Sequence, residues 1–190
     1  MSEIKERPIL FSAPMVRAIL EGRKTVTRRV VKFPLKDKAT GCWLAGNEIG
    51  PVEVRDNSPF GQPGERLWVR EAWARIGIAQ APDQEWVVYR ESDNRTDYGG
   101  PWKPGIHMFR RDSRILLEIT DVRVERLQDI SEAQAAAEGV GIQAIESFRG
   151  AGVDRPAGFA FRDLWTSING DANWSANPWV WVVEFKQVTP

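Results

Sequence analysis

The chain has few of the residues that most metal sites and catalytic triads require. Its 190 residues include a single cysteine, Cys42, and a single histidine, His107. A structural zinc site takes four ligands, mostly thiolates and imidazoles, which this chain cannot supply, and a lone cysteine forms no internal disulfide. A Ser-His-Asp or Cys-His triad would depend on His107, which follows a polar run rich in glycine and proline. The sequence therefore predicts a site without metal or cofactor, and Cys42 is compatible with a reducing compartment.

Common phosphate-binding signatures and long apolar runs are also missing. The sequence contains neither a G-x-x-x-x-G-K-[ST] loop nor a G-x-G-x-x-G turn. It has no apolar run of about 18 residues and no signal peptide, so we expect a soluble, cytoplasmic protein without a membrane partner. A chain of this length with 42% hydrophobic residues can bury one sizeable core. We therefore expect residues 1–190 to form a single domain.

Charge is balanced over the whole chain but unevenly distributed along it. The 26 Lys and Arg residues equal the 26 Asp and Glu residues, which argues against an indiscriminate polyanion binder. Residues 17–38 contain eight basic and two acidic residues, whereas residues 125–146 contain one basic and five acidic residues. This asymmetry predicts a basic surface of limited size.

Hydrophobic periodicity predicts mostly strands and a few short helices. The apolar runs typical of strands are 66–73, 85–89, 114–120, 122–127 and 179–185. The last run is nearly continuous, which indicates a strand buried at the centre of the core. Helices are expected over 16–21, 131–138 and 160–167. Gly22 and Gly139 are in position to end the first two, and Ser131 to cap the second. The polar segments 36–62 and 90–113 are predicted to be loops or hairpin insertions.

A basic segment over residues 22–29 directly follows the first predicted helix, with the sequence Gly-Arg-Lys-Thr-Val-Thr-Arg-Arg. Desolvation and neighbouring arginines both disfavour a protonated lysine, so Lys24 can be partly neutral near pH 7 and accept a proton from Thr27. In a regular strand these two side chains point to opposite faces, so the pair requires a bend or a helical turn between them. The arginines would hold an anion or a polar base. A solvated basic turn is the alternative.

Four motifs, in this order along the chain, resemble the ASCH family of the PUA-like superfamily. They lie at 19–29, 64–71, 130–139 and 181–185 and together span nearly the whole chain. The resemblance implies an α+β fold, built on a small, partly open β-barrel with flanking short helices. Residues 147–178 resemble a longer variant of the family that phages and prophages carry.

The same resemblance implies an activity on modified cytidine. Small bacterial members of the family are amidohydrolases of N4-acetylcytidine that use a lysine, a threonine and a glutamate, without a cofactor. Matched by motif, these are Lys24 as the base, Thr27 as the nucleophile, and Glu138 to hold Lys24 or polarise the substrate. At a helix end Glu138 opposes the helix dipole, so another interaction must place it there unless it is simply solvated. We also expect an accessible Lys24, so that Lys24→Ala would leave the fold intact.

Other side chains are candidates for holding the substrate, a modified cytidine nucleoside or RNA. The set comprises Arg23, Arg28, Arg29, Glu71 and Trp73. Glu71 can bind a base edge or simply pair with an arginine. Trp68, Trp73 or Trp102 can stack on a base, although most of the nine tryptophans must belong to the core.

Two further function classes remain open at this stage. One is a PUA-like module that binds RNA or DNA without catalysis, with phosphate contacts from Arg23, Lys24, Arg28, Arg29, Arg110, Arg111 and Arg114. The other is a ribonuclease, which would depend on Lys24 and a carboxylate because no histidine general acid is well placed.

Overall fold

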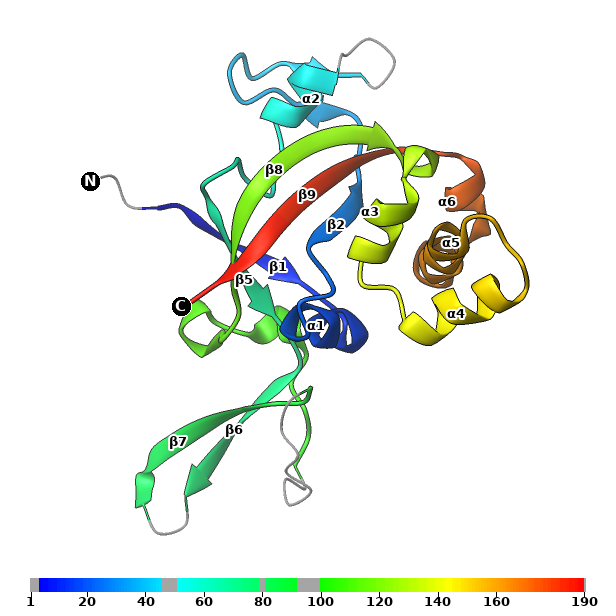
Figure 1. The fold of residues 1–190 in the computed structure, drawn as a ribbon. Helices are drawn as coiled ribbons and strands as arrows, with labels where there is room; N and C mark the ends of the chain where they lie inside the picture. The colour runs from blue at the N-terminus through cyan, green and yellow to red at the C-terminus, as the bar shows by residue number, and fades with distance from the viewer. Residues whose placement is uncertain (1–3, 46–50, 79–80, 92–99, 190) are drawn as a thin grey trace.

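The computed structural model describes residues 4–45, 51–78, 81–91 and 100–189. Its largest sheet has five strands in the order β1 (Glu6–Leu10), β5 (Arg66–Arg70), β8 (Leu116–Arg126), β9 (Trp179–Val188) and β2 (Val26–Val30). β1 runs parallel to β5 and the other pairs are antiparallel. β8 and β9 curve strongly, and β1 and β2 remain the two edges of the sheet (Figure 1). The expected α+β fold with a partly open barrel is confirmed.

Two hydrophobic clusters cover the two faces of this sheet. Side chains of β9 alternate between them, because successive residues of a strand point to opposite faces. Trp181 and Val183 enter the cluster beside α1 (Ala13–Leu20), and Val182 enters the cluster beneath α5 (Pro156–Asn169). Burial on both faces explains why the 179–185 run is almost entirely apolar. Its expected central position is also confirmed, since β9 lies between β8 and β2.

The helix boundaries follow local capping chemistry. α1 is followed by Gly22, whose φ of +72° suits a glycine. α3 (Glu132–Ala137) begins after Ser131, which forms a capping box with Gln134. The expected helix over 160–167 is longer in the structure, because Pro156 is compatible with the first turn of α5. α4 (Ile142–Gly150) and α6 (Asp171–Ser175) were not predicted.

Two predicted strand boundaries are wrong. The runs 114–120 and 122–127 form one strand, β8, in which a register shift between Ile119 and Asp121 accommodates the break in alternation. Conversely, the run 66–73 is divided, because the chain leaves the large sheet after β5 and starts a separate hairpin. This hairpin consists of β6 (Trp73–Ile78) and β7 (Ala81–Tyr89), and it extends away from the barrel (Figure 1).

Short elements occupy the predicted insertions. Within 36–62 and just before it lie β3 (Leu35–Lys36), β4 (Trp43–Leu44) and α2 (Pro51–Asp56). The 90–113 segment contains the 3-10 helices η1 (Gly105–His107) and η2 (Arg110–Asp112), and its residues 92–99 lie outside the described residues. A further 3-10 turn, η3 (Leu127–Asp129), follows β8. None of the helices in the described part combines the length and apolar character needed to cross a bilayer.

Candidate functional site

A cleft of about 490 Å³ lies along the open edge of β2. Thr27 and Arg29 line it from one face of the sheet and Arg28 and Val30 from the other, since side chains alternate along the strand. The walls are largely apolar, formed by Met15, Leu35, Phe60, Phe161, Leu164, Trp165, Ile168 and Trp181. A cavity of this size and character suits one small planar ligand.

The backbone of β2 directs towards this cleft polar groups that no other described strand pairs with. Thr25 accepts from Phe185 N–H and Val31 donates to Trp179 O, which fixes the register of the β2–β9 pair. In an antiparallel pair the residues between such hydrogen-bonded positions direct both N–H and C=O away from the partner strand. Val26, Arg28 and Val30 therefore face outward. Lys24 Nζ donates a hydrogen bond to the carbonyl of Val26. The backbone N–H and C=O groups of Arg28 and Val30 therefore remain directed towards the cleft.

Lys24 lies at the end of this edge and is fully buried, with 0% of its side chain exposed. Its Nζ donates to the carbonyl oxygens of Val26 and Glu138 at 2.8 and 2.7 Å, and to Glu138 Oε2 at 2.9 Å. Three acceptors match the three donors of an ammonium group. The expectation of an accessible lysine is wrong, because Lys24 is buried inside the structure. Its removal is therefore expected to affect the fold.

Glu138 connects Lys24 to a second buried cation. Its other oxygen, Oε1, accepts from Arg28 Nη1 at 3.1 Å, and Arg28 Nη2 donates to Glu125 Oε2 at 3.1 Å. Arg28 is also fully buried, and Glu138 is 4% exposed. These two cations supply the interaction that places a carboxylate at the C-terminal end of α3 against the helix dipole. Glu138 is therefore not a solvated surface residue.

Gly139 allows the end of α3 to approach the basic segment this closely. Lys24 and Glu138 form an isolated antiparallel bridge, and Thr25 N–H donates to the Ala137 carbonyl at 3.0 Å. Gly139 has φ +80°, and a Cβ there would come within 2.8 Å of the Cβ atoms of both Ala18 and Lys24. Only glycine can adopt this positive φ and leave the Cβ position empty, so no neighbour has to move.

Burial lowers the pKa of Lys24, and the Glu138 carboxylate opposes that effect through charge and a hydrogen bond. The nearby Arg29 and Arg28 lower the pKa of Lys24 further. A lowered pKa of Lys24 agrees with the expectation from the sequence. The hydrogen-bond pattern, however, is that of the protonated form, so a basic role for Lys24 requires it first to give up a proton.

Thr27 lines the cleft and is 2% exposed. Within the described part of the chain its hydroxyl makes no hydrogen bond, and all three Lys24 donors are directed at other oxygens. Arg29 lies beside it, donates from Nη2 to the Leu10 carbonyl at 2.8 Å, and stacks on Phe11. Burial lowers the pKa of Arg29, and Glu138 opposes this effect. Arg29 forms no ion pair with any described carboxylate.

Four of the candidates predicted from the sequence do not line the cleft, among them Lys24, which is buried at the end of the β2 edge. Arg23 is hydrogen-bonded to Glu21 and to the carbonyls that follow α3. Glu71 is buried and pairs with Arg114 through contacts of 2.8 and 2.9 Å. Of its two expected roles, the structure therefore shows pairing with an arginine and not binding of a base edge in the cleft. Trp73 is buried at the base of the β6–β7 hairpin, where it lines a different groove.

Sequence reasoning missed two contributions to the site. The first is Glu125, which accepts a hydrogen bond from Arg28 and a second one, of 2.5 Å, from Arg123 Nε. The spacing of two residues on a strand is the signal that places Arg123 and Glu125 on one face. Phe161 and Trp165 form part of the cleft wall and are four residues apart on α5. That spacing predicts a shared helix face, but not that the face lies over β2.

Comparison with known proteins gives no sequence-level assignment, since no family model and no curated protein matches the chain. Among solved structures, the chain is similar to an ASCH domain from Lactobacillus crispatus JV V101, at 14% identity and a TM-score of 0.43, covering 98% of this chain and 81% of that one. It is also similar to an Enterococcus faecalis V583 protein described under the family model DUF984, at 10% identity and a TM-score of 0.42. That match covers 91% of this chain and 66% of the other, so the chain spans just under two thirds of that protein.

Proposed function

We propose that the β2 cleft binds a cytosine base that carries an acyl group on its exocyclic nitrogen, and hydrolyses that amide bond without a metal. The observation that carries the proposal is the meeting of the Thr27 hydroxyl, the cationic Arg29 and the unpaired β2 backbone in one cleft, next to the buried pair of Lys24 and Glu138. The resemblance of the sequence motifs to ASCH amidohydrolases supports the same assignment.

Recognition of the base would combine stacking and backbone hydrogen bonds. The adjacent N–H and C=O groups of Arg28 offer one donor and one acceptor to the edge of a planar base. Apolar walls that include Trp165 and Trp181 suit its faces. Buried Nε atoms of Arg28 and Arg29 have no acceptor among the described residues, so a polar ligand in the cleft would satisfy donors that are otherwise costly to bury.

The chemistry begins with a proton rearrangement inside the buried pair. Lys24 passes a proton to Glu138 Oε2 across 2.9 Å, which leaves a neutral amine. The freed amine accepts the hydroxyl proton of Thr27 as Oγ1 attacks the acyl carbonyl. The amide C–N bond then breaks, Lys24 gives the proton it took from Thr27 to the exocyclic nitrogen, and an acyl-threonine ester remains. Water attacks this ester, the C–O bond to Thr27 breaks, and the products are the carboxylic acid, the free base and the restored hydroxyl.

The decisive experiment is incubation of the protein with N4-acetylcytidine and chromatographic detection of cytidine. Glu138→Gln is expected to reduce turnover at least about 100-fold, because the amide can neither hold a proton for Lys24 nor balance its charge. Glu184→Gln is the matched control, since Glu184 also pairs with an arginine of the large sheet, Arg123, but does not line the cleft. It should retain turnover within about threefold.

Salt dependence separates this proposal from a binding module without catalysis. Turnover of an uncharged nucleoside should barely change between about 50 and 200 mM salt, whereas binding dominated by phosphate contacts weakens steeply. If the parent protein releases no cytidine while it binds RNA in a salt-dependent way, the hydrolase proposal is wrong and the cleft is a binding site.

A further inference from the structure

A second groove, of about 440 Å³, lies at the base of the β6–β7 hairpin and shares none of its lining residues with the β2 cleft. Trp73 and Lys103 hold its two sides together through reciprocal backbone hydrogen bonds of 3.2 and 2.8 Å. Gly105 packs so closely on the backbone of Arg70 and Glu71 that a Cβ there would lie about 3 Å from both. The groove is therefore built by tight backbone contacts between the hairpin and the 103–109 segment.

Cations stacked on aromatic rings surround this groove. Arg70 lies 4.7 Å from the centre of the Trp68 ring, Lys103 lies 5.3 Å from Trp73, and Arg111 lies 5.5 Å from Phe109. Among the described residues, none of these three cations forms an ion pair with a carboxylate. Their charge is thus available to a ligand from outside the chain.

The carboxylates of this region already have partners. Asp112 pairs with Arg75 at 2.7 Å, Glu71 with Arg114 at 2.8 Å, and Glu6 with Arg110. Arg75 also contacts Glu85 at 3.3 Å. The described acidic groups therefore neutralise other arginines, and the unpaired cations give the groove a local positive charge within a chain of zero net charge.

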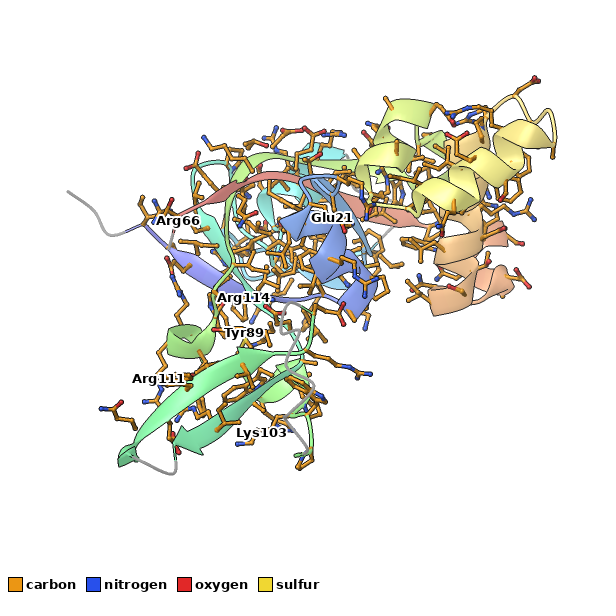
Figure 2. The ribbon with its side chains drawn as sticks, turned by 60° about the horizontal axis from the view of Figure 1, so that its bottom comes forward. Glu21, Arg66, Tyr89, Lys103, Arg111 and Arg114 are labelled. Atoms are coloured by element: carbon orange, nitrogen blue, oxygen red, sulfur yellow. The ribbon has the colours of Figure 1, made fainter. Side chains whose placement is uncertain are left out.

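The groove also offers exposed aromatic surface and unused donors. Phe109 is 60% exposed although it is a large apolar side chain. Arg70 Nε and Trp73 Nε1 are buried without an acceptor in the described part of the chain. In Figure 2, Lys103 and Arg111 lie on opposite sides of the hairpin, so a bound chain that contacts both would run across its base.

We propose that this groove binds single-stranded nucleic acid, in addition to the nucleoside site in the β2 cleft. Cations without carboxylate partners contact phosphates, and exposed aromatic rings stack on bases, which a duplex keeps inaccessible. Lys103 in the groove and Arg111 beyond it would contact separate phosphates of the same strand, and Phe109 would stack on a base. The two sites are independent in this proposal, so a nucleotide strand can be held on the hairpin whatever chemistry the cleft performs.

The test is fluorescence anisotropy with a labelled 12-nucleotide single-stranded RNA, repeated over a range of salt concentrations. The double variant Lys103→Gln, Arg111→Gln should lower the slope of log affinity against log salt by about 1.4, because each lost phosphate contact on a single strand contributes about 0.7. Phe109→Ala should weaken binding about 5-fold to 100-fold, whereas Phe109→Trp should restore it. Thermal unfolding of each variant checks that the fold is retained.

The matched control is the double variant Lys36→Gln, Arg162→Gln, which removes two exposed cations far from the hairpin. It should leave the salt slope unchanged. Equal slopes for the two double variants, or equal affinity for a duplex of the same sequence, would overturn the proposal. Cytidine release from N4-acetylcytidine is measured in parallel, and the Lys103 and Arg111 variant should keep it, so failure of the hairpin site and failure of the hydrolase proposal are distinguishable.

Discussion

Two cations beside the β2 cleft and two cations near the hairpin groove lie in opposite environments. Lys24 and Arg28 are fully buried, and each contacts the carboxylate of Glu138. Lys103 and Arg111 are exposed, stack on aromatic rings and have no carboxylate partner within the described residues. The first pair is held by the protein itself, whereas the second pair remains available to an external anion.

This difference separates a chemical site from a binding surface. Removing a charge from water is costly, and a buried cation is tolerated only when hydrogen bonds and an opposite charge compensate. Such a network is rigid, and its proton affinities depend on burial. Exposed cations keep their hydration, so their interaction with a ligand is weaker for each contact and is screened by salt. Substitutions at the buried cations should therefore cost far more than substitutions at the exposed ones.

Lys24→Ala should have the largest effect on stability. It leaves Glu138 with one cation instead of two and leaves two backbone carbonyls without a donor, so we expect a loss of about 3–5 kcal/mol in the free energy of unfolding. Turnover should also be abolished. Lys103→Ala in the groove should cost no more than about 0.5 kcal/mol. Urea denaturation of both variants measures the difference, and similar losses would contradict the contrast.

Thr27→Val should reduce turnover by at least about 100-fold with little change in stability, because it keeps the branched shape and removes only the nucleophile. Thr27→Ser keeps a hydroxyl and should retain part of the activity. Steady-state rates on N4-acetylcytidine, together with thermal unfolding, test both variants. Equal rates in the Val and Ser variants would show that Thr27 has a structural role.

Gly139→Ala should destabilise the protein by about 2–4 kcal/mol, because it combines a positive φ with overpacking against Ala18 and Lys24. Gly152 provides a matched control, since it has φ +75° but no atom within 4 Å of the position that a Cβ would take. Gly152→Ala should therefore show only the backbone penalty of about 1–2 kcal/mol. Equal losses in urea denaturation would mean that the contact between α3 and Lys24 is not tight.

The smallest expected effect concerns the ion pair of Glu6 and Arg110, near the hairpin. The hydrogen bond from Arg110 lowers the pKa of Glu6 from its ordinary value of 4.5, while burial opposes the shift. A lowered carboxyl pKa contributes stability above the unfolded value, and this contribution is lost as pH falls through the folded pKa. Glu6→Gln should flatten the decline in melting temperature below about pH 4.5. At neutral pH it should cost at most about 1 kcal/mol, because the pair is partly exposed.

Much of the fold was predictable because it depends on local patterns. Ser131 and Gly139 mark the ends of α3, and the continuous apolar run of β9 indicates a strand buried on both faces. The register shift in β8 and the division of 66–73 were not predictable, because pairing partners decide where a strand bends or leaves a sheet.

Local sequence patterns are sufficient to show that the basic segment around Lys24 and Thr27 follows a short helix, and that a carboxylate, Glu138, ends another helix. The contact between Lys24 and Glu138 depends on the folded chain, because the two residues are separated by 114 positions and meet through a bridge that Gly139 makes possible. It also decided which candidates lie elsewhere. Glu71 and Trp73 lie where the chain leaves the large sheet for the hairpin. A local sequence pattern does not predict the direction that the chain takes after a strand.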